Sequence, residues 1–456
     1  MAHPLRTQPA RTWRTLALLG AGSLALAACG GSSETTATPT SAAPAASSAA
    51  VPTTSASASA SASATTAPAV NKADGTLTIG SLLPQTGNLA FLGPPEFAGV
   101  NTAIKEINAN GGVLGKDVQY EEGDSGDAQQ DVANPTVDRL LQAKADAIIG
   151  AASSGVSFTV IDKITSAGVI EYSPANTSPD FTDYNDKGLY FRTAPSDVLQ
   201  GRVLGETVLA DGFSNVGILA LQDPYGEGLS KNVTDTVKEG GGETATPKTL
   251  FYDPAASNFD AQVTELKQAK PDAIVLIGFE ESSKVIQALI KQGIGPQDVQ
   301  LYLVDGNLSN TLGDGLPKGV LEGVKGSLPG AAAPGDFRKR VLEVAPKLKE
   351  FPYTAESYDA VITTALGAIA AKSDAGTDIA KVLPDVTRDG KKCTTFKDCS
   401  TLAKAGTDFD YDGVSGPIEF SDKGDPTQAS IGIYTYGADN TYDSDKGEYQ
   451  QGKIDG

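Results

Sequence analysis

The chain contains 456 residues, which is more than one compact core accommodates, so its length predicts two lobes or domains together with segments that carry no core. Its 36 Lys and Arg residues and 56 Asp and Glu residues give a net charge of −20 at pH 7. Because basic surfaces supply most of the affinity for nucleic acid, this acidic balance argues against nucleic acid as a partner.

The first residues have the features of an export signal. Three arginines precede an apolar stretch, 16–26, that is too short to span a membrane, and Leu-Ala-Ala then precedes Cys29. Small residues before a cysteine resemble a bacterial lipobox, although an ordinary cleavage site with an incidental cysteine is the alternative. We expect a lipoprotein signal peptide over residues 1–28, and diacylation of Cys29 that anchors the chain on the outer face of the cell membrane. Since the only histidine is His3, the mature chain would have neither a His-based triad nor a zinc site containing histidine.

A segment of low complexity follows the expected lipid anchor. Residues 29–72 consist, after Cys29, almost entirely of Ala, Ser, Thr, Pro and Gly. Such a composition buries too little apolar surface to fold and predicts a disordered tether that holds the folded part away from the membrane.

Folded sequence is expected from about residue 76, where strand-like runs begin to alternate with stretches of helical spacing. The first run predicts strands at 76–83, 118–122, 146–150 and 169–172, and helices around 97–107, 132–141 and 160–164. After Arg192 the second run predicts strands at 215–221, 250–252, 273–278 and 301–304, and helices around 203–209, 229–237, 259–266 and 285–289. This alternation is typical of parallel, doubly wound sheets, and two runs of roughly 120 residues imply two lobes.

The last part of the chain predicts additions to these lobes. Residues 337–405 read mainly as helix, and two strands are expected at 416–420 and 430–436. Cys393 and Cys399 lie six residues apart within the helical part. In an oxidising compartment we expect them to form a disulfide that closes a small surface loop, with a reactive thiol or a metal pair as the alternatives.

Six segments, taken in order, form a specific set of motifs. They are Ile79–Gly87, Glu106–Lys116, Ile148–Gly150 with Ser153-Ser154, Ser173–Pro179, Phe191–Thr193 and Tyr225–Gly228. Together they resemble the type I periplasmic binding proteins, in particular the leucine/isoleucine/valine-binding branch, from about residue 76 to residue 436.

The resemblance implies an α/β fold of two doubly wound, Rossmann-like lobes joined by a three-segment hinge. The expected path is lobe 1 over 73–194, lobe 2 over 195–328, a return to lobe 1 over 329–416, and the end of lobe 2 with a tail over 417–456.

In such sheets, ligands bind beyond the carboxyl ends of strands, often at helix N-termini. Ser153 and Ser154 follow one expected strand and open a helix, and the family uses the serine at position 154 for the ligand's α-carboxylate. Ala175, Asn176 and Thr177 follow the next strand, and the family uses a backbone carbonyl and the threonine hydroxyl of this loop for the amine and the carboxylate. A helix-capping serine and a simple turn are the alternative interpretations.

Three residues of the expected second lobe complete the candidate site. Tyr225, Phe279 and Asp305 each follow a strand. The resemblance implies that the carboxylate of Asp305 pairs with the ammonium group of a ligand, which is a strong interaction in a closed cleft. Packing in the core is the alternative role for Phe279.

The resemblance further implies an extracytoplasmic substrate-binding protein that captures an amino acid, with a branched-chain one favoured, by closure of its lobes. It implies permease subunits of an ABC importer as partners, a monomeric state, and neither a catalytic residue, a cofactor nor a metal. An enzyme is disfavoured because the sequence has no histidine base, metal cluster, Gly-x-Ser-x-Gly elbow or P-loop. A ligand sensor, or the binding of an amide, urea or a small organic acid by the same fold, stays an alternative.

An acidic segment near the end of the chain fits the EF-hand calcium pattern position by position. Asp408, Asp410 and Asp412 are followed by a glycine and, five residues later, by Glu419. The glycine and proline at positions 416 and 417 argue against the second helix of an EF-hand. We therefore expect no calcium site here.

Overall fold

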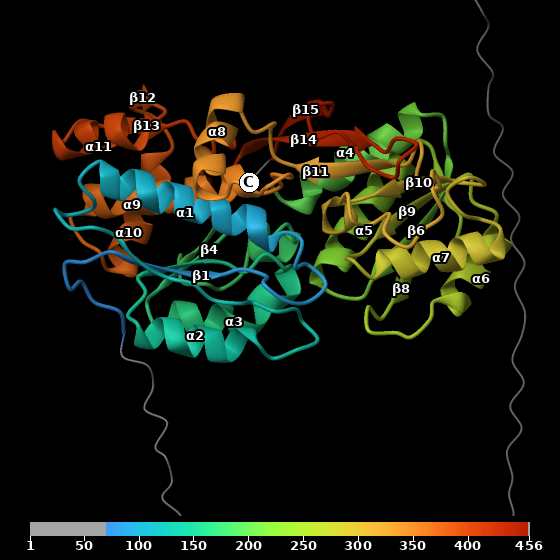
Figure 1. Cartoon of the computed structure of the whole chain (residues 1–456), viewed down its shortest axis with the longest axis horizontal. Helices are drawn as coiled ribbons and strands as arrows, with labels where there is room; N and C mark the ends of the chain where they lie inside the picture. Colours follow the sequence, from blue (N-terminus) through green and yellow to red (C-terminus); the bar gives the residue numbers. More distant parts are fainter. Residues whose placement is uncertain (1–69, 455–456) are drawn as a thin grey trace, which may run out of the picture. The chain divides into compact units, whose positions relative to one another are not determined.

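The computed structural model describes residues 70–454, drawn in colour in Figure 1. The expected signal peptide, the lipidation site Cys29 and residues 29–69 of the expected tether lie outside the described residues. Asn71 forms hydrogen bonds with the folded body: its backbone N–H donates to the Ala167 carbonyl oxygen at 2.6 Å, and its side-chain amide donates to Asp146 at 2.8 Å. None of the helices within residues 70–454 combines the length and the apolar composition that a membrane span requires.

Lobe 1 is built on a five-stranded parallel sheet with the order β2-β1-β3-β4-β5. Its elements are β1 (Thr78–Leu82), α1 (Gly93–Ala109), β2 (Gln119–Glu121), α2 (Ala133–Gln142), β3 (Ala147–Gly150), α3 (Ser154–Ser166), β4 (Ile170–Ser173) and β5 (Tyr190–Arg192). The central strands are buried on both faces because helices cover both: α1 and α9 (Thr354–Ala371) lie on one side of the sheet, and α2 and α3 lie on the other (Figure 1). Ile149 packs with side chains of α1 and α9, while its neighbour Ile148 packs with side chains of α2 and α3.

Lobe 2 is built on an eight-stranded sheet with the order β15-β14-β11-β10-β9-β6-β7, in which β8 also pairs with β6. Its elements are α4 (Asp197–Ala210), β6 (Asn215–Leu221), α5 (Pro224–Glu239), β7 (Glu243–Thr244), β8 (Leu250–Tyr252), α6 (Asp260–Ala269), β9 (Ala273–Ile277), α7 (Ser282–Gln292), β10 (Gln300–Leu303), β11 (Lys325–Pro329), β14 (Gln428–Thr435) and β15 (Glu448–Lys453). Only β14 and β15 run antiparallel to their neighbours.

The chain returns to lobe 1 between β11 and β14. The returning elements are α8 (Gly335–Val344), α9 (Thr354–Ala371), α10 (Gly376–Val382), β12 (Lys391–Cys393), α11 (Phe396–Lys404) and β13 (Phe409–Tyr411). The long helix α9 packs against α1 and joins the core of lobe 1. The chain therefore crosses between the lobes three times, as expected for a three-segment hinge, and the predicted fold class is confirmed.

The strand expected at 416–420 is absent, and this prediction is wrong. Ile418 and Glu419 have positive φ angles of 61° and 44°, which a strand cannot accommodate, and only Phe420 forms an isolated bridge, with Pro426. The side chains of Ile418 and Phe420 pack in the core of lobe 1 instead. The alternating apolar residues do indicate buried side chains, but the backbone that places them in the core forms a turn and not a strand.

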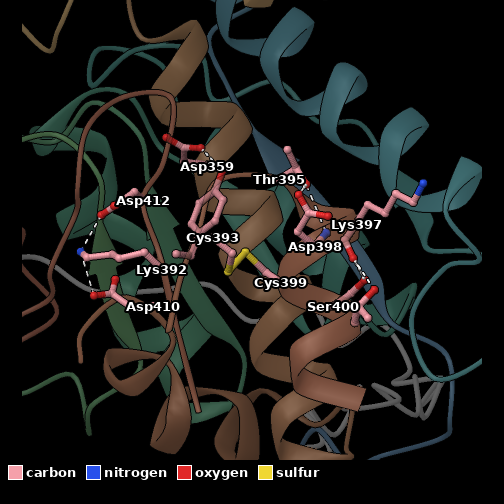
Figure 2. Close-up of a disulfide and its surroundings, with 12 residues drawn as sticks. Asp359, Lys392, Cys393, Thr395, Lys397, Asp398, Cys399, Ser400, Asp410 and Asp412 are labelled. Atoms are coloured by element: carbon pink, nitrogen blue, oxygen red, sulfur yellow. Dashed lines mark hydrogen bonds and ion pairs between the residues drawn. A yellow bond between two sulfur atoms is a disulfide. The ribbon is translucent and has the colours of Figure 1, made fainter. Parts of the chain in front are cut away.

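The small sheet of β12 and β13 carries the disulfide between Cys393 and Cys399, which joins the end of β12 to α11 (Figure 2). The calcium-like segment runs through this sheet. Asp410 and Asp412 each lie 2.8 Å from the ammonium group of Lys392, which reaches between them. The motif thus forms strand β13 and an ion-paired turn, and in residues 70–454 no group of three or more His, Cys, Asp or Glu side chains is arranged to hold a metal ion.

Candidate ligand-binding site

The N-terminus of α3 forms the first wall of the site. Strand β3 ends at Gly150, where φ is 127° and a β-carbon would lie 2.0 Å from the carbonyl oxygen of Leu82, so only glycine fits this turn. Ser153 caps the helix, and its hydroxyl accepts from the Val156 N–H at 3.4 Å. The Ser154 hydroxyl accepts from the Ser178 N–H at 3.3 Å and so joins this turn to the next loop.

The loop after β4 forms the second wall. Ala175 and Thr177 line the cavity, and both are buried. The side chain of Asn176 turns away from the cavity: its amide donates to the Ala152 carbonyl at 2.9 Å, and its oxygen accepts from the Tyr190 hydroxyl at 3.0 Å. Asn176 thus supports the two loops of lobe 1 from behind, whereas its neighbours face the site.

Several backbone N–H groups of these loops are free to bind a ligand. The N–H groups of Ser154, Gly155 and Thr177 donate to no other atom of the described residues. The first two belong to the start of α3, where the helix dipole is positive. Buried N–H groups normally have a partner, so this wall is prepared for an acceptor such as a carboxylate.

Lobe 2 supplies a buried carboxylate and an aromatic pair. The rings of Tyr225 and Phe279 stack with centroids 5.6 Å apart. Asp305 accepts from the Tyr225 hydroxyl at 2.8 Å and from the Gln200 amide at 2.7 Å through one oxygen, and from the Tyr353 hydroxyl at 2.7 Å through the other. Burial raises the pKa of Asp305, and these three hydrogen bonds oppose the rise.

No Lys or Arg of the described chain forms an ion pair with Asp305. All three of its donors are neutral, so the burial of this carboxylate is not offset by a cation within residues 70–454. A second buried acid lies nearby. Burial and the charge of Asp305 raise the pKa of Asp197, whose backbone N–H donates to the Thr177 carbonyl at 2.7 Å. A cation placed beside the carboxylate of Asp305 would therefore be stabilised.

One cavity brings these residues together at the boundary of the lobes. Its lining consists of Leu89, Leu92, Ala152, Ser153, Ser154, Ala175, Thr177, Tyr225, Phe279, Asp305, Gly306 and Tyr353. Seven of the eight predicted ligand-binding residues thus meet, and Asn176 lies behind the lining. No sequence motif predicts Tyr353 in the site; this residue precedes α9 in a left-handed conformation with φ 55°.

The two lobes touch across this cavity. Besides the contact of Tyr353 with Asp305, the Glu280 N–H of lobe 2 donates to the Asn88 carbonyl of lobe 1 at 3.2 Å. The space left between the lining side chains is about 10 Å³, room for about one water molecule. An amino acid would enter this cavity only if its walls moved apart.

Comparison with known proteins agrees with this arrangement. A model of the periplasmic binding protein family matches residues 76–440. A Leu/Ile/Val-binding protein homolog 1 of Brucella abortus (strain 2308) is 29% identical over 377 residues, which cover 80% of this chain and 92% of the relative.

Solved structures share the fold at lower sequence identity. The leucine binding protein LivK of Thermotoga maritima has a TM-score of 0.66 at 22% identity and covers 82% of this chain and 98% of its own. LivJ of Streptococcus pneumoniae, in complex with isoleucine, has a TM-score of 0.65 at 22% identity, with 83% and 100% covered. A solute binding protein of R. palustris, in complex with benzoate, has a TM-score of 0.61 at 19% identity, with 81% and 95% covered. Since the family model spans most of the chain and the lobes have this architecture, the chain belongs to the periplasmic binding protein family, in its type I fold.

Proposed function

We propose that the chain is an extracytoplasmic binding protein, not an enzyme, that captures an α-amino acid between its two lobes and delivers it to the permease of an ABC importer. A branched-chain amino acid is the favoured ligand. The Brucella relative is named for Leu, Ile and Val, and LivJ of the same fold holds isoleucine. In this proposal Cys29 carries the lipid anchor, and the protein acts as a monomer without metal or cofactor.

The proposal depends on one observation: free N–H donors and a carboxylate line the same cavity from opposite sides. Free N–H groups of Ser154 and Thr177 lie on the lobe 1 side, and the carboxylate of Asp305 lies on the lobe 2 side. An α-amino acid has a carboxylate for the first wall and an ammonium for the second. Leu89 and Leu92 supply an apolar surface for its side chain.

Closure of the lobes is the proposed mechanism. A ligand held first by the loops of lobe 1 gains the contact with Asp305 only when lobe 2 closes, so binding favours the closed form. The partner permease then distinguishes the closed protein from the open one. The same lobes would serve a ligand sensor, and loss of labelled amino acid uptake on deletion of the gene would favour transport over sensing.

The stacked rings of Tyr225 and Phe279 support one second candidate, an aromatic acid, because a protein of the same fold was solved with benzoate. A thermal-shift screen of the chain from residue 66 onward, which forms one compact unit, separates the candidates. A ligand at 100 times its dissociation constant should stabilise the protein by about 2.7 kcal/mol. We expect the shift with leucine, isoleucine or valine. A shift with benzoate, urea, amides or short acids alone would contradict the amino acid assignment.

A further inference from the structure

Arg192 is the largest charged side chain in the core, with 0% of its surface exposed. It lies at the end of β5, directly before the first crossing between the lobes. Phe181 lies under its guanidinium group, 5.9 Å from ring centroid to Cζ. An arginine buried so completely needs partners for most of its five N–H groups.

The hydrogen-bond partners of the guanidinium group belong to two segments that are far apart in sequence. Nη1 donates to the carbonyl oxygens of Ser178 at 2.7 Å and Asn176 at 3.3 Å, which flank the candidate ligand residue Thr177. Nε donates to Asp425 Oδ1 at 2.6 Å. Asp425 belongs to the third crossing between the lobes, before β14.

Thr182 forms a second connection between Arg192 and Asp425. The Thr182 hydroxyl donates to Asp425 Oδ2 at 2.6 Å, and Nη2 of Arg192 donates to the same hydroxyl at 3.2 Å. The backbone of the third crossing is held as well, because the Arg192 N–H donates to the carbonyl oxygen of Gly424 at 3.1 Å. Gly424 has a φ of 80°, and a β-carbon there would lie 2.4 Å from the carbonyl of Tyr190, so the backbone can approach β5 only at a glycine.

The direction of these bonds decides where the ligand loop presents its donors. In a trans peptide the C=O of one residue and the N–H of the next point in opposite directions. A guanidinium that holds the Asn176 carbonyl therefore turns the Thr177 N–H away from itself. That N–H has no partner among the described residues, and Thr177 lines the cavity.

We propose that Arg192, held by Asp425, is a positioning residue that sets the carboxylate selectivity of the site by fixing the 176–178 loop with the Thr177 N–H toward the ligand. This inference rests on the proposed function, since it assigns the recognition of a ligand carboxylate to this loop. Lysine cannot replace Arg192, because an ammonium group cannot hold two carbonyls and a carboxylate in one planar, forked arrangement. The pair also connects the ligand loop to two of the three crossings, so the loop and the hinge move together.

Titration calorimetry on the full chain with L-leucine and L-leucinamide tests the inference, because the amide keeps the ammonium and the side chain but lacks the carboxylate. We expect Arg192→Lys to weaken L-leucine by about tenfold or more and L-leucinamide by less than about twofold, so that the ratio of the two dissociation constants shrinks. The partly exposed pair of Arg388 and Asp422, 2.9 Å apart, offers the matched control Arg388→Lys, which should leave the ratio unchanged.

A merely structural role would weaken both probes in parallel, and that result would overturn the inference. If Arg192→Lys does not fold, as judged by circular dichroism, Asp425→Asn tests the same ratio with the guanidinium group still in place. An unchanged ratio in a folded Asp425→Asn variant would likewise overturn the inference. If the unaltered protein binds neither probe, both the proposed function and this inference are wrong. If it binds L-leucine but the ratio of the two dissociation constants is the same in the variant, only the inference is wrong.

Discussion

The Tyr353 hydroxyl donates a hydrogen bond of 2.7 Å to Asp305, and so joins the segment before α9 in lobe 1 to the end of β10 in lobe 2. Both residues are buried, and both line the cavity at the boundary of the lobes. The bond forms only when the lobes are close, and it ends on the carboxylate proposed to bind the ligand's ammonium. This hydrogen bond therefore links closure of the lobes to the carboxylate that is proposed to recognise the ligand.

Removal of this hydroxyl should weaken the closed form. A hydrogen bond to a charged group is worth about 1.5–3 kcal/mol, so Tyr353→Phe should lower the affinity for the ligand by roughly ten- to a hundredfold. Titration calorimetry measures the change. Tyr184→Phe is the matched control, because the Tyr184 hydroxyl donates to the exposed Asp162 within lobe 1. Equal affinities of Tyr353→Phe and the unaltered protein would show that the bond does not contribute to closure.

Asp305→Asn tests the ammonium site. The variant keeps the shape of the side chain but removes the charge that would pair with a ligand amine, so we expect the affinity for L-leucine to fall by at least about a hundredfold. Asp298→Asn, at an exposed position, should bind as the unaltered protein does. Retention of full affinity by Asp305→Asn would exclude this carboxylate as the ammonium partner.

Glu356 should make stability depend on pH. Burial raises its pKa to about 8, with a smaller contribution from the charge of Asp359. Between the ordinary pKa of glutamate and about 8, the folded protein holds a proton that the unfolded chain has lost, so the free energy of unfolding falls as pH rises. The slope for one proton is at most about 1.4 kcal/mol per pH unit.

Urea unfolding at pH 5, 6.5 and 8 measures this dependence. Glu356→Gln removes one titrating group and should make the fall in the free energy of unfolding less steep, while the exposed Glu265→Gln should leave the fall unchanged. Parallel pH curves for Glu356→Gln and the unaltered protein would contradict the assignment. Burial and, to a smaller extent, the charge of Glu356 also raise the pKa of Glu96, and burial raises the pKa of Glu171 to about 8, so these buried acids should contribute to the dependence that remains.

The disulfide should stabilise lobe 1 without affecting the ligand site. Cys393 and Cys399 close a loop with a sequence separation of 6 residues, for which the loss of chain entropy in the unfolded state is worth roughly 2 kcal/mol. Replacing both with alanine should lower the melting temperature by a few degrees. Since neither residue lines the cavity, the dissociation constant for L-leucine should stay within about twofold of its value in the unaltered protein. A larger change would show that the disulfide affects the ligand site.

The sequence predicted the parts of the fold whose pattern is local. Strands β1, β3 and β9 are buried throughout and β6 is buried after its first residue, and the loops after these strands form the site because parallel strands end at one edge of the sheet. Strand β11 was missed because it contains glycine, serine and proline, and it becomes a strand only by pairing with β10 and β14.

For two residues of the site, the local sequence does not predict where the side chain lies. Tyr353 enters the cavity from a turn before α9, far along the chain from the other lining residues, and no local motif announces it. Asn176 is predicted to line the site together with Thr177 because both belong to the loop after β4, but adjacent side chains of an extended loop point in opposite directions, and Asn176 points into lobe 1.

We propose that one closed cavity recognises both charges of an amino acid. The most direct measurement is titration calorimetry of the chain from residue 66 onward with L-leucine and with 4-methylpentanoate, which has the same carbon skeleton and carboxylate but no ammonium group. We expect binding of L-leucine and a loss of affinity of at least about a hundredfold with 4-methylpentanoate, because Asp305 would remain buried without a cation. Equal or tighter binding of 4-methylpentanoate would show that the cavity does not recognise the ammonium group.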